Sequence, residues 1–148
     1  MKAARIMLER LEALAIERAD FAFETTLASR SFAPWLRARI DSGYEFHLFH
    51  LFDLWLSNAE AAIARVASRV RAGGHDIPEH TIRRRYQRGI RNLFDLYMPI
   101  ATRWTVLNAA GPLPTPISGG GLGSPIEVLD SENWARLCAR RHDPEPRT

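Results

Sequence analysis

Apolar residues recur every three or four positions in two early stretches of the chain, a spacing that is typical of amphipathic helices. The first stretch covers residues 3–19, and the second runs from Arg30 to Ser42, where Gly43 provides a stop. The first pattern begins almost at Met1, without the Ser, Thr, Asp or Asn that usually caps a helix. We therefore expect that a preceding part of the domain is missing.

Four short apolar runs predict β-strands, at residues 21–26, 44–56, 104–108 and 126–129. The second run contains His47-Leu48-Phe49, followed at once by the identical triplet His50-Leu51-Phe52. An odd insertion turns every later side chain to the opposite face of a strand. We therefore expect a bulge or a register shift here.

Further helices are expected between these strands. A capping-box sequence at Ser57–Glu60 opens one helix, which Gly73-Gly74 ends, and Asp76–Glu79 opens another that continues to about Thr102. Asp130 is expected to cap a last helix. The Gly- and Pro-rich residues 111–124 predict a mobile loop.

This alternation of helices and strands predicts an α/β fold with a mostly parallel sheet covered by helices. The 148 residues suit one domain, residues 1–148. With 46% hydrophobic and 25% charged residues, the chain has the composition of a globular protein rather than a disordered one.

Cysteine content and the length of the apolar runs exclude several classes. The single Cys138 cannot form an internal disulfide, and no Cys/His cluster predicts a zinc site. No apolar run approaches the ~20 residues of a membrane-spanning helix. We therefore expect a cytoplasmic protein without a membrane partner.

Positive charge is concentrated in one segment. Between Arg65 and Arg91 there are eight arginines against Asp76 and Glu79, a local charge of +6, whereas the whole chain carries only +3. A basic segment on a slightly acidic body can face a phosphate-bearing ligand.

Two of these arginines, Arg71 and Arg84, flank the flexible Gly73-Gly74 pair. Guanidinium groups suit phosphate because they are planar, permanently charged and bidentate, and a hinged pair of helices can close over a nucleotide. The alternative is an exposed basic face. That alternative is favoured for three other arginines, Arg65, Arg88 and Arg91.

A carboxylate and two hydroxyls, from Glu24, Thr25 and Thr26, come at the C-terminal end of the first expected strand. Ligands of parallel α/β sheets bind outside the carboxyl ends of the strands. These side chains could orient a substrate hydroxyl or a sugar, or they could be a helix cap beside a solvated carboxylate.

Three segments together resemble the zeta-toxin-like family of P-loop kinases, namely FAFETTLASR, RVRAGGHDIPEHTIRRRYQRGIRNLFDLY and PIEVLDSENWARL. The resemblance implies a three-layer P-loop NTPase-type fold with a helical lid at about residues 71–91. It also implies a kinase that transfers phosphate from ATP, with Mg²⁺, to a hydroxyl of a nucleotide sugar such as UDP-N-acetylglucosamine. An antitoxin-like protein is the partner that the resemblance suggests.

Site residues follow from this resemblance by position. Glu24, Thr26 and Arg30 correspond to substrate-binding residues, and Arg71 and Arg84 to catalytic, phosphate-contacting arginines. The nucleotide-binding positions are Arg69, Arg85 and Asn108. Arg69 and Arg85 neighbour the catalytic pair and could exchange roles with it.

The family's G-x-x-G-x-G-K-[ST] phosphate loop and the general-base Asp that follows it are both missing from this sequence. Gly119-Gly120-Gly121 precedes neither a helix nor a lysine, so it is not such a loop. We therefore expect a truncated kinase that is inactive alone and binds neither ATP nor Mg²⁺ tightly.

Two other functions stay open. The chain could be a non-catalytic remnant that binds a ligand or a protein partner. Nucleic-acid binding by the arginine-rich helices ranks last, because the aromatic residues belong to apolar stripes and strands and are not interleaved with arginine as stacking platforms.

The resemblance places the missing strand at the centre of the sheet, between the strands expected at 21–26 and 44–56. Two apolar edges would then lack a partner, so we predict that the isolated chain is marginally stable or prone to aggregate. Size-exclusion chromatography and a thermal melt check this. Monomeric elution with a sharp cooperative transition would contradict it.

Overall fold

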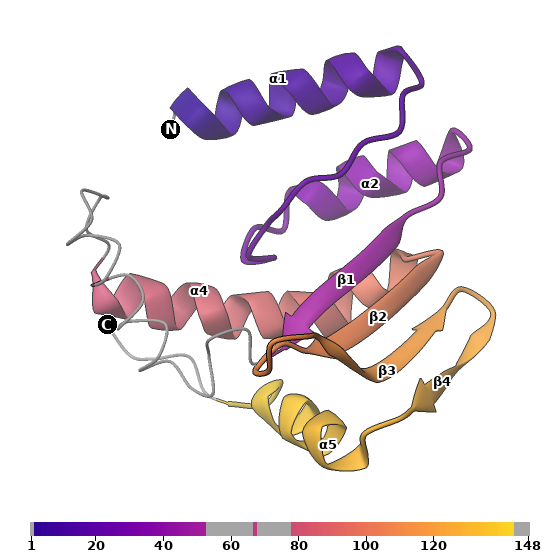
Figure 1. Cartoon of the computed structure of the whole chain (residues 1–148). Helices are drawn as coiled ribbons and strands as arrows, with labels where there is room; N and C mark the ends of the chain where they lie inside the picture. Colours follow the sequence, from indigo (N-terminus) through magenta and orange to yellow (C-terminus); the bar gives the residue numbers. More distant parts are fainter. Residues whose placement is uncertain (1, 53–66, 68–77, 144–148) are drawn as a thin grey trace.

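The computed structural model describes residues 2–52, 67 and 78–143 (Figure 1). Its elements, in chain order, are α1 (Lys2–Ile16), α2 (Phe32–Asp41), β1 (His47–Phe52), α4 (Glu79–Asn92), the π-helical turn η1 (Leu93–Tyr97), the 3₁₀ turn η2 (Met98–Ile100), β2 (Arg103–Asn108), β3 (Thr115–Gly121), β4 (Ser124–Val128) and α5 (Ser131–Arg140). The helix expected from Ser57 and the Gly73-Gly74 pair lie outside the described residues.

The four strands form one open sheet in the order β1-β2-β3-β4. The pair β1 and β2 is parallel, whereas β2 with β3 and β3 with β4 are antiparallel. The α/β class is therefore confirmed, but the expected mostly parallel sheet is wrong. Both antiparallel pairs involve β3. This strand and the turn into β4 are formed by the segment around residues 111–124, which was expected to be a loop.

Glycine in β3 serves close packing rather than mobility. A Cβ at Gly120 would lie 2.7 Å from the ring of Trp104, and one at Gly121 would lie 2.2 Å from the carbonyl oxygen of Thr102. Trp104 is itself buried and stacks on Trp134 of α5, with 5.9 Å between ring centroids. The glycines let β3 lie flat against β2 beside this ring, a role that local composition does not reveal.

The duplicated His-Leu-Phe triplets form β1 without a bulge. All six residues pair with β2 in one continuous register. The odd repeat has the expected effect on the side chains: Leu48 and Phe52 are buried, whereas Phe49 and Leu51 are exposed. The predicted bulge or shift is therefore wrong, because the strand keeps its register and leaves two apolar side chains outside the core.

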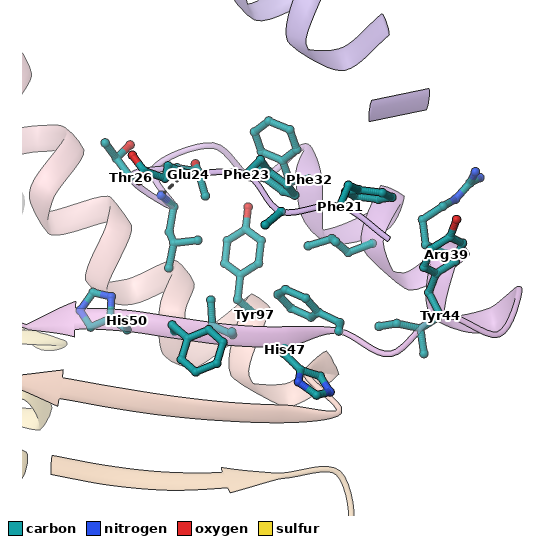
Figure 2. A pocket seen from close by; sticks show the side chains of 18 of the residues that line it. Phe21, Phe23, Glu24, Thr26, Phe32, Arg39, Tyr44, His47, His50 and Tyr97 are labelled. Atoms are coloured by element: carbon teal, nitrogen blue, oxygen red, sulfur yellow. Dashed lines mark hydrogen bonds between the residues drawn. The ribbon is translucent and has the colours of Figure 1, made fainter. Parts of the chain in front are cut away.

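Residues 21–26 do not form a strand, so that expectation is also wrong. The segment crosses in front of α2 and runs beside β1 (Figures 1 and 2). Within the described part of the chain, no backbone–backbone hydrogen bond joins residues 21–26 to another element. An apolar run forms a strand only where a neighbouring strand pairs with it.

The expected helices agree well with the structure. The carboxylate of Asp130 accepts a hydrogen bond from the backbone N–H of Asn133 at 3.0 Å and caps α5 as predicted. The long apolar stripe of α4 continues through the wider π-helical turn η1 and the tighter 3₁₀ turn η2. It ends at Ile100, just after Pro99. At the other end of the molecule, the indole of Trp35 in α2 donates to Glu12 of α1 at 2.6 Å.

One core joins all of these elements except β4, whose five residues are exposed. Its buried side chains come from α1, α2, β1, α4 with its following turns, β2, β3 and α5. α4 crosses behind β1 and β2 (Figure 1). Leu93, Tyr97 and Leu137 are almost completely buried, and they form the centre of this core together with Phe52 and Val106.

The segment after residue 21 is held on α4 by close backbone contact. A Cβ at Gly89 would lie 2.4 Å from the carbonyl oxygen of Thr26, so only glycine allows the approach. The Asn92 side chain donates to the carbonyl of Leu27 at 2.8 Å, and the Tyr97 hydroxyl donates to that of Ser29 at 2.5 Å. Successive positions of α4 and η1 therefore fix residues 26–29.

We predict that Gly89→Ala destabilises the protein by about 2 kcal/mol, because overpacking of this contact outweighs the helix propensity of alanine, worth ~1 kcal/mol. Urea denaturation followed by circular dichroism measures the change. Gly111→Ala is the matched control, since its Cβ would meet only an ordinary contact of 3.7 Å. Equal midpoints for the two variants would contradict the prediction.

Candidate functional site

A cleft of about 1710 Å³ lies between residues 20–27 and β1. Its remaining wall comes from α2, α4 and η1, including Phe32, Leu36, Ile90 and Tyr97. Figure 2 shows Tyr97 standing in the space between the segment and the strand. The cleft is therefore apolar in its interior, and its polar groups lie toward its ends.

One end of the cleft gathers the polar residues that the sequence singled out. Glu24, Thr25 and Thr26 line it from the connecting segment, and Arg85 lines it from α4. All four are exposed, so they are accessible to a ligand in solution. A carboxylate, two hydroxyls and a guanidinium group thus line one cleft.

The backbone around Thr25 has an uncommon conformation. Leu27 has a φ of 57° although its side chain is buried, and its N–H donates to the Thr25 hydroxyl at 3.2 Å. A left-handed conformation is unfavourable for leucine and persists only where its surroundings fix it. Asn92 provides that fixation by binding the Leu27 carbonyl. The turn therefore presents Glu24 and the two threonines in a defined position.

Tyr97 is the largest polar side chain beneath this turn. Its buried ring lies in the cleft wall, and its hydroxyl donates to the Ser29 carbonyl. Burial raises the pKa of Tyr97 above its usual value of 10.0, so the hydroxyl keeps its proton near pH 7 and stays a hydrogen-bond donor.

The other predicted site residues are less favourably placed. Arg84 is half-buried on α4 and does not line the cleft, whereas its neighbour Arg85 does. Arg30 is exposed beyond the turn and is not among the lining residues. Arg69 and Arg71 lie outside the described residues, so the expected lid at 71–91 can be followed only from α4.

Asn108 has a local structural role at the end of β2. Its side-chain oxygen accepts a hydrogen bond from the backbone N–H of Ala110 at 2.9 Å, which closes a turn. It is not part of the cleft wall. The structure thus brings Glu24, Thr26 and Arg85 together and leaves Asn108, Arg84 and Arg30 apart from them.

His50 is a titratable cleft residue that was not among the site residues expected from the sequence. It is half-buried in β1, and desolvation lowers its pKa from 6.5 to about 4, so the imidazole is neutral near pH 7. His47, by contrast, is exposed and contacts Glu45 at 3.0 Å. The two histidines differ because they lie on opposite faces of β1, one in each copy of the triplet.

Gly89 and Asn92 support the site but were not among the site residues expected from the sequence. The signal available was a glycine and a buried-side asparagine within an otherwise regular helical stripe. Either residue is unfavourable inside a helix and usually has a packing reason. Here the reason is that both residues contact the segment that carries Glu24.

In residues 2–52, 67 and 78–143, no group of three or more His, Cys, Asp or Glu side chains is arranged to hold a metal ion. In the same part of the chain, no helix is both long and apolar enough to cross a membrane. Comparisons with protein-family models, with curated proteins and with solved structures found no match to this chain.

We predict that the protein loses about 2 kcal/mol of stability between pH 6.5 and pH 4, because the unfolded chain binds a proton at His50 that the folded chain rejects. The folded pKa is the lower one, so the stability is present above pH 6.5 and is lost as the pH falls toward 4. Urea midpoints across this range measure it.

The matched variants are His50→Gln and His47→Gln. His50→Gln should remove most of the histidine-dependent slope, whereas His47→Gln should keep it, because only His50 is desolvated in β1. An unchanged slope in His50→Gln would contradict the assignment.

Proposed function

We propose that this chain is the substrate-side part of an ATP-dependent small-molecule kinase of the zeta-toxin-like type. In the complete protein it would position a hydroxyl of a nucleotide sugar, such as UDP-N-acetylglucosamine, for phosphorylation. Residues 1–148 alone bind such a substrate and do not transfer phosphate.

The observation that supports this proposal is the meeting of Glu24, Thr26 and Arg85 at one cleft opening. A carboxylate can accept a hydrogen bond from a sugar hydroxyl, and the threonine hydroxyl can donate or accept a second one. The guanidinium of Arg85 lines the same cleft from α4 and can neutralise a phosphate of the same ligand. Positioning and charge neutralisation are the main tasks of a protein in phosphoryl transfer.

In this arrangement Arg85 replaces Arg84 as the arginine of α4 that contacts phosphate. The two are neighbours on the helix, so they point about 100° apart around its axis. The resemblance had left this exchange of roles open. Arg71 keeps its proposed catalytic role. This residue lies outside the described part of the chain.

Several parts needed for catalysis are not supplied by this sequence. Binding of the ATP phosphates would require a phosphate loop, and activation of the substrate hydroxyl would require a general-base Asp. Neither motif occurs in residues 1–148. We therefore assign no catalytic step to the residues of this chain.

We predict that the isolated chain binds UDP-N-acetylglucosamine and that Glu24→Gln weakens this binding by roughly tenfold, through the loss of a charge-assisted hydrogen bond. Arg85→Ala should weaken it by roughly fivefold, since an exposed ion pair contributes less. Isothermal titration calorimetry measures both.

Arg37→Ala is the matched control for charge, because Arg37 is exposed on α2 and does not line the cleft. It should bind like the unchanged chain. Transfer of labelled phosphate from ATP by the isolated chain would refute the proposal that residues 1–148 bind the substrate but do not transfer phosphate. Binding of oligonucleotides with a steep salt dependence, and no binding of the sugar nucleotide, would favour the nucleic-acid alternative.

A further inference from the structure

His50 occupies a core-facing position of β1. Leu48 and Phe52, two residues before and after it, are both buried in the core. Its partner in β2, Val106, is completely buried. Because side chains alternate between the two faces of a strand, the imidazole of His50 lies on the same face as these apolar side chains.

The surroundings of His50 in the cleft are mainly apolar. Ile82, Tyr86 and Ile90 of α4 line the same space as His50, which lines it from β1. The side chain is half-buried, so one part of the ring packs against its neighbours and another part is open to the cleft. A polar ring is thus placed in a position where an apolar side chain would be expected.

The ring nitrogens of His50 are not used to hold the fold. Among the described residues, no hydrogen bond or ion pair joins the His50 ring to another group. His47, in contrast, contacts the Glu45 carboxylate at 3.0 Å. Desolvation alone lowers the pKa of His50 to about 4, with no contribution from a neighbouring charge. Buried polar groups are normally paired, so an unpaired ring that faces a cleft calls for an explanation.

His50 lies at the polar end of the cleft. Figure 2 shows it toward the end of β1 where Glu24 and Thr26 also lie. Thr26 contacts α4 at Gly89, and Arg85 lies one turn earlier on the same helix. A ligand that reaches the carboxylate of Glu24 therefore enters the space onto which the imidazole opens.

We propose that His50 is a further ligand-binding residue, which forms a hydrogen bond with a hydroxyl group of the amino sugar from the floor of the cleft. A neutral imidazole has one N–H donor and one bare nitrogen that accepts. A hydroxyl group can likewise donate and accept, so it can pair with either nitrogen. This inference rests on the proposed sugar-nucleotide site and adds a recognition residue to Glu24, Thr26 and Arg85.

The same observations argue against other roles for His50. A phosphate group would favour a cation, and an imidazole with a pKa of about 4 is neutral near pH 7. Such a low pKa also makes the ring a weak base, so His50 does not replace the missing general-base Asp. In the described part of the chain, His50 belongs to no group of three or more metal-binding side chains.

The test begins with His50→Leu, which replaces the ring by an apolar side chain of similar size. We expect the thermal transition of the free chain to rise by about 3 °C, because an unpaired polar group leaves an apolar site. A gain in stability together with a loss of ligand binding is the signature of a polar group that is kept for function.

Binding is measured by isothermal titration calorimetry near pH 7 with UDP-N-acetylglucosamine and with UDP. His50→Leu should weaken the binding of UDP-N-acetylglucosamine roughly fivefold, through the loss of one hydrogen bond between neutral groups. Its affinity for UDP should stay within about twofold, because UDP lacks the amino sugar. His50→Gln keeps a donor and an acceptor, so it should bind the sugar nucleotide more tightly than His50→Leu.

His80→Leu is the matched control, since His80 is exposed on α4 and does not line the cleft. It should leave both affinities unchanged. NMR of the ring nitrogens in the unchanged chain provides a second measurement, with the His50 signals assigned from their loss in His50→Gln. UDP-N-acetylglucosamine should shift these signals and UDP should not. This measurement decides if His50→Leu does not fold.

Four outcomes would overturn the inference. Equal binding of UDP-N-acetylglucosamine by His50→Leu and the unchanged chain, or unshifted ring nitrogens, would remove His50 from the site and leave the proposed function standing. An equal loss of affinity for UDP would move the contact away from the amino sugar. A folded His50→Leu variant with a lower transition temperature would show that the ring stabilises the fold. No binding of UDP-N-acetylglucosamine by the unchanged chain would instead refute the proposed function, and this inference with it.

Discussion

The backbone contact between Gly89 and Thr26 is the constraint on which the other features of this structure depend. It brings the segment before α2 onto α4, and the side chains of Asn92 and Tyr97 extend the attachment to the next residues. Because this segment has no strand neighbour among the residues that the structure describes, these three contacts replace sheet hydrogen bonds. The cleft, its polar end and the position of Glu24 all follow from this attachment.

The sequence predicted well those elements whose signals are local. The helices α1, α2 and α5 follow from amphipathic spacing and, for α5, from the cap at Asp130, all of which lie within a few residues. Strand β3 could not be found in this way. Its glycines are required by the ring of Trp104 and the carbonyl of Thr102, which belong to another part of the sequence.

Strand expectations failed for a related reason. A run such as Phe21–Thr26 has the composition of a strand, but a strand exists only when a neighbour pairs with it. The triplet repeat in β1 was interpreted correctly in one respect, since it reverses the faces of the second copy. It was wrong in the other respect, because exposure of Phe49 and Leu51 costs less than breaking a continuous ladder with β2.

Part of the candidate site could be predicted from the sequence. Glu24 and Thr26 were selected because they end an apolar run, and they do line the cleft although the run is not a strand. The choice between Arg84 and Arg85 could not be made, since it depends on the rotation of α4 about its axis. That rotation is set by Gly89, four positions after Arg85 and on the same side of the helix.

The attachment at Gly89 also explains why the cleft stays open. Residues 26–29 are fixed on α4 and η1, and Tyr97 fills the space beneath them, so the segment cannot move sideways onto β1. Nor can β1 move toward the segment, because all six of its residues are paired with β2. The two walls of the cleft are thereby held apart before any ligand binds, which lowers the entropic cost of ordering them on binding.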